Sequence, residues 1–107
     1  MAISEIGVQD LSALLDEGEV ALIDVREADE YHEAHVAGAV LIPLSEFAGR
    51  TDELPAGQLH LICAAGGRSM KACEFLDSPD RDLVNIAGGT KGWVAAGLPF
   101  VTGDQPR

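Results

Sequence analysis

Short apolar runs alternate with amphipathic segments along most of the chain. Apolar runs at 20–23, 59–62 and 83–86 have the length of buried strands, and 38–43 indicates a further brief strand. Helical spacing and helix-ending residues predict helices over 8–17, 27–33, 67–77 and 90–96, helical turns over 44–54 and an extended tail over 98–100. This alternation predicts an α/β domain with a central, mostly parallel sheet and helices on both faces.

The composition fits one compact domain spanning 1–107. The chain has 107 residues and is 47% hydrophobic, and domains most often contain about 100–150 residues. Only 5% of the residues are aromatic. The core must therefore be built mainly from aliphatic residues, as in buried parallel strands that are covered by helices.

The net charge opposes several classes of partner. Eighteen acidic residues against seven basic ones give a formal charge of -11, and the first 49 residues hold eleven acids with Arg26 as their only base. Proteins bind nucleic acids and anionic membranes through basic patches, so neither is an expected partner. An anionic substrate stays compatible, because the Debye length is about 8 Å at physiological salt and remote carboxylates are screened.

The segment 1–8 has neither the basic region nor the apolar core of a signal peptide. No run approaches the roughly 18 apolar residues of a membrane span. We therefore expect a cytoplasmic, reducing setting, where free thiols persist. The sequence leaves the oligomeric state open, with a monomer as the expectation. A module of a longer polypeptide would show the same features.

The most informative residue is Cys63, which ends the apolar run 59–62 and is followed by Ala64, Ala65, Gly66, Gly67, Arg68 and Ser69. Taken alone, a cysteine at this place is often a small core residue. The glycine pair and Arg68 favour a different interpretation, because a permissive backbone can curl until its N–H groups surround the sulfur. Such a nest before a helix N-terminus binds anions and lowers the pKa of a thiol. Cys63 is thus the candidate nucleophile.

The second cysteine, Cys73, is not expected to form a disulfide with Cys63. It lies more than a turn along the helix that Cys63 precedes, at a rise of about 1.5 Å per residue, which exceeds disulfide reach. We expect Cys73 to pack inward with Met70 and Leu76. A role as a resolving thiol is the alternative.

Three segments together resemble the rhodanese-like (sulfurtransferase) domain, and the resemblance covers nearly the whole chain. The first holds Asp24, Val25 and Arg26 with Glu30, Tyr31, His35, Val36, Gly38 and Ala39. The second is the loop 63–68 with Ser69, and the third is Gly88, Gly89, Thr90, Lys91, Gly92 and Trp93. Each segment alone is modest evidence for the resemblance, but the three segments in this order and at this spacing are specific for the family.

The resemblance implies that Cys63 takes a sulfane sulfur from a donor, holds it as a persulfide and passes it to a thiol or cyanide. The substrate-binding positions would be Ala64, Ala65, Gly66, Gly67, Arg68 and Ser69, with Arg68 attracting a small anionic donor such as thiosulfate. Loop amides and the dipole of the helix over 67–77 would stabilise the outer sulfur. No cofactor is implied.

Five further positions are expected to support the loop. Asp24 should accept hydrogen bonds from nearby loop amides, and Arg26 should pair with Glu30 and fix the turn. His35 is architectural in the resembled family, and Trp93 is expected to anchor the core with a share of the pocket wall. His32 and His60 have no expected role, and no metal-ligand spacing is present.

The loop departs from thiosulfate-specific members of the family, some of which carry extra basic or hydroxyl residues where this chain has Ala64 and Ala65. Thiosulfate is therefore expected to be a poor donor, and a protein persulfide or a low-molecular-weight persulfide is the alternative.

Two rival functions remain. A cysteine phosphatase or arsenate reductase would place five residues between cysteine and arginine, whereas four separate Cys63 from Arg68, and Ile62 stands where such enzymes commonly have histidine. A non-catalytic rhodanese-like interaction module would generally lack the cysteine that is retained here.

Overall fold

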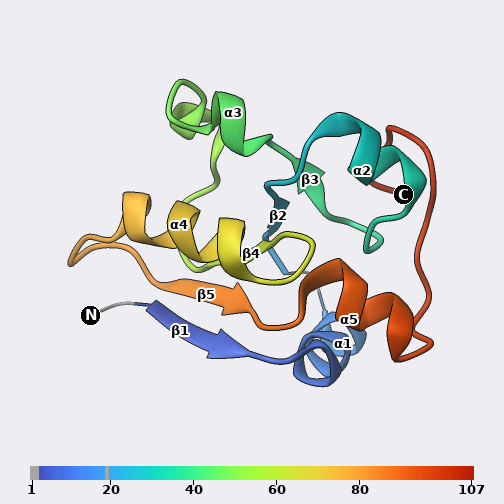
Figure 1. Ribbon diagram of the computed structural model, residues 1–107. Helices are drawn as coiled ribbons and strands as arrows, with labels where there is room; N and C mark the ends of the chain where they lie inside the picture. The colour runs from blue at the N-terminus through green and yellow to red at the C-terminus, as the bar shows by residue number, and fades with distance from the viewer. Residues whose placement is uncertain (1–2, 19) are drawn as a thin grey trace.

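The computed structural model describes residues 3–18 and 20–107 and contains one five-stranded sheet (Figure 1). The strands are β1 (Ile3–Ile6), β2 (Leu22–Asp24), β3 (Val40–Leu41), β4 (Leu59–Ile62) and β5 (Leu83–Ile86), in the spatial order β1-β5-β4-β2-β3. Every strand pairing within the described residues is parallel. The predicted α/β class with a mostly parallel sheet is confirmed.

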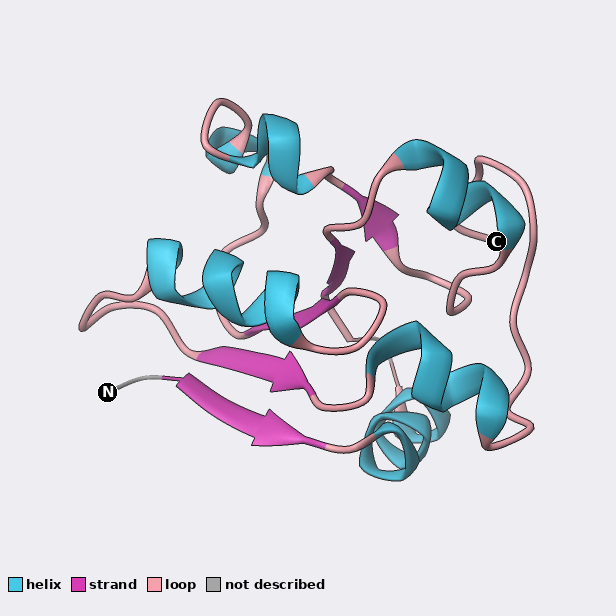
Figure 2. Ribbon diagram, in the orientation of Figure 1, coloured by secondary structure: helices cyan, strands magenta, loops and turns pink. Residues whose placement is uncertain are grey.

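Helices cover both faces of the sheet, as predicted, and Figure 2 shows them on either side of the strands. They are α1 (Val8–Glu17), α2 (Ala28–Glu33), α3 (Leu44–Phe47), α4 (Gly67–Leu76) and α5 (Gly89–Ala95), with a 3-10 turn at Thr51–Glu53. Side chains of α3 and α4 belong to one core cluster, whereas those of α1, α2 and α5 belong to the other. None of these helices has the length and apolar character needed to cross a membrane.

The two core clusters share the central strands, because successive side chains of a strand point to opposite faces. On β4, Leu61 contributes to the cluster under α3 and α4, and Ile62 to the cluster under α1 and α5. All four residues of β4 and of β5 are buried. The carboxyl ends of these strands therefore meet inside the molecule, where Cys63 follows β4.

The element boundaries differ from the prediction mainly in the strands. The run 20–23 becomes a strand only at Leu22 and continues to Asp24, and the brief strand expected over 38–43 is reduced to Val40–Leu41. The predicted helices agree with the structure to within one residue at each end, and the turns expected over 44–54 appear as α3 and the 3-10 turn.

Strand β1 is absent from the sequence prediction. Its two outer residues are half-buried, whereas Ser4 and Glu5 are exposed, so the segment shows neither a strand period nor a helix period. Parallel pairing with β5, from Ile3 opposite Leu83 to Ile6 opposite Ile86, makes it a strand.

Candidate active site

Cys63 lies directly after β4, at the carboxyl edge of the parallel sheet, where the sites of open α/β sheets gather. The residue is only 1% exposed. The chain then turns through Ala64, Ala65 and Gly66 into α4, and Gly66 has a φ of +108° that strongly favours glycine. This turn brings the Gly66 N–H to 3.0 Å from Cys63 Sγ. The loop therefore curls around the sulfur, as the glycine pair predicts.

Hydrogen-bond donors favour the ionised form of Cys63. Burial of the thiol opposes ionisation, but the Ser69 hydroxyl and the backbone amides of Ser69, Gly66 and Ala65 outweigh it and lower the pKa of Cys63. Ser69 Oγ is 3.3 Å from Sγ and comes from the first turn of α4. The direction matches the prediction of an activated thiolate.

The first turn of α5 holds the other side of the loop. The Thr90 N–H donates to the Cys63 carbonyl at 2.8 Å, and the Lys91 N–H donates to the Ala64 carbonyl at 3.0 Å. A Cβ on Gly89 would lie 2.4 Å from the Cys63 carbonyl oxygen, and the φ of Gly89 is +57°. Only glycine lets α5 approach this closely. The segment 88–93 therefore holds the loop 63–68, called the active loop below, in place.

A buried polar network behind the loop was not found from the sequence. Ser69 Oγ lies 2.5 Å from Asn85 Oδ1, an acceptor that competes with Cys63 Sγ for the single hydroxyl proton of Ser69. Asn85 Nδ2 donates to Glu5 Oε2 at 2.7 Å and to the Gly66 carbonyl at 3.1 Å. Both Ser69 and Asn85 are 0% exposed. An asparagine inside the otherwise apolar strand β5 is the signal that could have revealed it, since a buried amide requires hydrogen-bond partners.

The ion pairs of the site differ from those expected. Arg68 binds Glu30 through two parallel hydrogen bonds, Nη1 to Oε1 at 2.7 Å and Nη2 to Oε2 at 2.8 Å. These bonds lower the pKa of Glu30 from its usual 4.5 to about 2 and raise the pKa of Arg68. The charge of Arg68 is thus largely neutralised by Glu30, although the sequence suggests a cation that is free to attract an anionic donor.

The predicted pairing of Arg26 with Glu30 is wrong. Arg26 instead binds Asp24, with Nε 3.1 Å from Oδ1 and Nη2 2.9 Å from Oδ2, and Nη2 also donates to the Ala34 carbonyl. Asp24 accepts the Arg26 backbone N–H at 3.0 Å, as expected of a carboxylate that fixes a turn. A separation of four positions along the chain favours an ion pair between Arg26 and Glu30. The fold instead brings Arg68 of α4 to Glu30 of α2.

Among the described residues, neither His35 nor Trp93 forms a hydrogen bond to Cys63 Sγ. Both ring nitrogens of His35 are 2.8 Å from backbone carbonyl oxygens, those of Tyr31 and Gln105, and the ring stacks on Tyr31. Trp93 is buried in the core, and its Nε1 donates to the Pro99 carbonyl at 2.7 Å. The pocket that Trp93 lines contains Val36 and Leu15 but no residue of the active loop. Its expected share in the pocket wall beside Cys63 is therefore not found.

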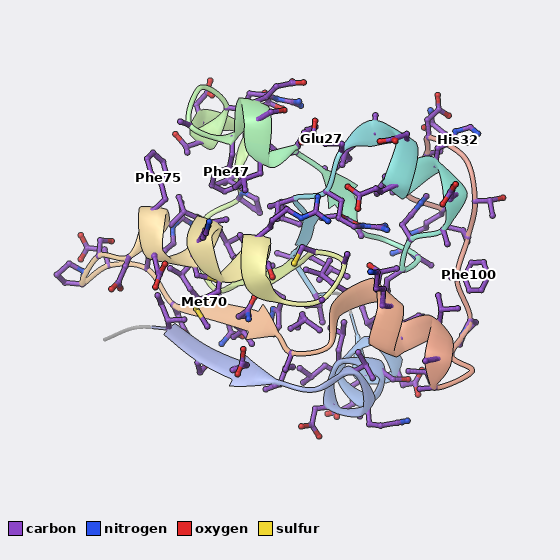
Figure 3. The ribbon with its side chains drawn as sticks, in the orientation of Figure 1. Glu27, His32, Phe47, Met70, Phe75 and Phe100 are labelled. Atoms are coloured by element: carbon purple, nitrogen blue, oxygen red, sulfur yellow. The ribbon has the colours of Figure 1, made fainter. Side chains whose placement is uncertain are left out.

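Both cysteines are free thiols, as predicted. Cys73 is 0% exposed and packs in one core cluster with Met70 and Leu76; Figure 3 labels Met70 beside α4. Burial raises the pKa of Cys73 to about 11, which disfavours its thiolate at neutral pH. Among the described residues, no group of three metal-ligating side chains is present.

Comparisons with known proteins agree with this architecture. The family model of the rhodanese-like domain matches residues 7–96. A sulfurtransferase of Allochromatium vinosum is 31% identical over 102 residues, with 92% of this chain and 95% of that protein covered. The crystal structure of a rhodanese-related protein from Thermoplasma volcanium has a TM-score of 0.84 at 31% identity and covers 92% of this chain and 97% of that one.

Another relative is longer than this chain. "Putative sulfur carrier protein YrkF" of Bacillus subtilis is 33% identical over 95 residues, and this chain spans about half of its length, 51%. The family model spans most of the chain, and the Thermoplasma volcanium structure shares its fold. The chain belongs to the family of rhodanese-like domains.

Proposed function

We propose that this chain is a sulfurtransferase in which Cys63 carries the transferred sulfur as a persulfide. The observation that supports the proposal most directly is the donor set at Sγ, with the Gly66 N–H at 3.0 Å and Ser69 Oγ at 3.3 Å. The sulfurtransferase of Allochromatium vinosum, which matches over nearly its whole length, supports sulfur transfer as the general activity.

The proposed reaction has two displacement steps. The Cys63 thiolate attacks the sulfane sulfur of the donor, a new S–S bond forms, and the donor's own S–S bond breaks so that its electron pair leaves with sulfite or with a thiolate. A nucleophilic acceptor then attacks the outer sulfur, and the electron pair of the Cys63 S–S bond returns to Sγ. Cyanide would leave as thiocyanate and a thiol as its persulfide.

The site favours a persulfide donor over thiosulfate. Ala64 and Ala65 bring no charge or hydroxyl to the loop, and Glu30 occupies both outer nitrogens of Arg68. Little uncompensated positive charge therefore lies beside Cys63 to bind thiosulfate, which is doubly charged. We expect catalysis with thiosulfate to be slow, and catalysis with a protein or low-molecular-weight persulfide to be faster.

The test is intact mass spectrometry after incubation with a sulfur donor. Wild-type protein should gain the mass of one sulfur atom and lose it with cyanide or a thiol reductant. Cys63→Ser should gain none while its unfolding transition stays near that of the wild type, because a hydroxyl cannot form the persulfide. The matched variant Cys73→Ser should still load, since Cys73 is packed in the core; a loaded Cys63→Ser protein would overturn the assignment.

A further inference from the structure

A pocket of about 420 Å³ lies directly beside the active loop. One wall comes from Glu33 and Ala34 at the end of α2, and the other from Lys91, Val94 and Ala95 of α5. Ala64, the residue after Cys63, lines it between the two walls. Figure 1 shows α2 and α5 on the same side of the molecule, with the loop before α4 reaching toward them. The volume suits a small molecule rather than a macromolecule.

Some of the charged side chains that line this pocket are neutralised by ion pairs, and others are not. Glu30 and Arg26 also line the pocket, but Glu30 is bound to Arg68, and Arg26 to Asp24. Glu33 and Lys91 are exposed, and neither forms an ion pair within the described residues. One uncompensated anion therefore stands on the α2 wall and one uncompensated cation on the α5 wall.

A second observation also indicates a missing ligand. Thr90 lines the same pocket and is only 4% exposed. Its Oγ1 is buried and has no hydrogen-bond partner among the described residues. Buried hydroxyls are nearly always hydrogen-bonded in folded proteins, so a polar molecule that contacts Thr90 in this pocket would supply the partner that the hydroxyl lacks.

We infer that this pocket is the acceptor subsite and that it takes small thiols of the amino-acid type, which carry both an ammonium and a carboxylate group. Glu33 receives the ammonium group and Lys91 the carboxylate. Ala34 and Val94 contact the carbon chain, and the thiol sulfur lies toward Ala64. This inference rests on the proposed function and adds the class of acceptor to it.

The charge arrangement disfavours the simpler thiols. A thiol with only a carboxylate meets Lys91 but is repelled by Glu33, and a thiol with only an ammonium group has the reverse problem. A neutral thiol gains neither contact. In the transfer step the acceptor thiolate attacks the outer sulfur of the Cys63 persulfide, so that the acceptor leaves as a persulfide and Cys63 as a thiolate.

The experiment measures kcat/KM for five acceptors with persulfide-loaded protein. The acceptors are cysteine, 3-mercaptopropionate, cysteamine, 2-mercaptoethanol and cyanide, with each thiol rate corrected for its thiolate fraction. We expect cysteine to exceed each of the other three thiols by about fivefold or more, since exposed ion pairs contribute modestly. Glu33→Gln should reduce the advantage of cysteine over 3-mercaptopropionate, and Lys91→Gln its advantage over cysteamine.

The controls separate this inference from the proposed function. Lys71→Gln removes an exposed cation of α4 that does not line the pocket, and it should leave the acceptor ratios unchanged. Equal rates for the four thiols would overturn the inference, and so would acceptor ratios that neither pocket variant changes. In both cases, transfer to cyanide would still support the proposed sulfurtransferase activity. Failure to transfer sulfur to any acceptor, cyanide included, would overturn both.

Discussion

At the scale of single residues, the pKa of Cys63 is lowered by neutral dipoles rather than by a nearby free cation. Burial works against the thiolate, and the hydroxyl of Ser69 together with loop amides works for it. Arg68, the expected cation, is bound by Glu30. Dipoles that are already oriented need no reorganisation when charge develops on sulfur, so they stabilise a thiolate or persulfide efficiently.

Ser69→Ala should therefore weaken the nucleophile without removing it. The variant loses the hydroxyl 3.3 Å from Sγ, so the pKa of Cys63 should rise. Alkylation at pH 6 should slow by roughly threefold or more, as expected for the loss of a hydrogen bond that contributes about 0.7 kcal/mol or more. The measurement is the rate of Cys63 alkylation as a function of pH, followed by mass spectrometry. Ser69→Thr, which keeps a hydroxyl, is the control. An unchanged pH profile in Ser69→Ala would show that the loop amides alone stabilise the thiolate.

At the scale of elements, α5 is part of the candidate active site although it carries no candidate reacting group. Its first two amides after Gly89 bind the carbonyls of Cys63 and Ala64. Because these two carbonyls accept hydrogen bonds from α5, the loop is held in the conformation that directs the amides of the following residues toward the sulfur. The close approach depends on the absence of a side chain at Gly89, whose Cβ would lie within 2.6 Å of three loop atoms.

Gly89→Ala should separate α5 from the loop. The contact is with backbone atoms, which have no flexible side chain to move away, and the φ of +57° adds strain. We expect a loss of stability of about 2 kcal/mol or more and a strong loss of sulfur transfer. In Gly92→Ala of the same helix, the nearest atom to the new Cβ is Val8 Cγ1 at 3.6 Å, so this control should keep near-normal stability and activity. Denaturant unfolding and transfer rates of the two variants compare them directly.

At the scale of the whole molecule, the two covering layers meet at the carboxyl edge of the sheet. The Glu30–Arg68 pair connects α2, which packs on one face, to α4, which packs on the other. Glu30 also accepts the Glu27 N–H in the capping box that begins α2. One carboxylate thus stabilises a helix start and holds the two layers together beside Cys63.

This pair predicts a specific acid dependence. Because the pKa of Glu30 falls from 4.5 to about 2 on folding, its stabilisation is present above about pH 4.5 and is lost as the pH falls toward 2. Both side chains are about one-third exposed, so screening limits the contribution to about 1 kcal/mol. Glu30→Gln should be less stable than the wild type at pH 6 and equally stable near pH 2, as measured by denaturant unfolding. A difference that persists at pH 2 would indicate a packing effect instead.

The amino-acid sequence by itself predicted most of the elements and the candidate nucleophile Cys63. Buried strands such as 59–62 and 83–86 and helices such as 8–17 follow from local periodicity, and the glycine pair after Cys63 is visible without any fold. The sequence prediction was weaker where pairing with another segment decides the structure. Strand β1 exists because β5 lies beside it, and no local pattern contains that information.

Only the tertiary structure decided the partners of the polar side chains. It paired Arg68 with Glu30 across 38 positions, Ser69 with Asn85 across 16, and Asn85 with Glu5 across 80. It also brought Glu33 and Lys91 to the two walls of one pocket. Charges and hydrogen-bonding groups select partners by distance in space, whereas the hydrophobic pattern that forms helices and strands repeats within a few residues of the chain. The sequence therefore indicates the candidate nucleophile, and the fold determines which groups surround it.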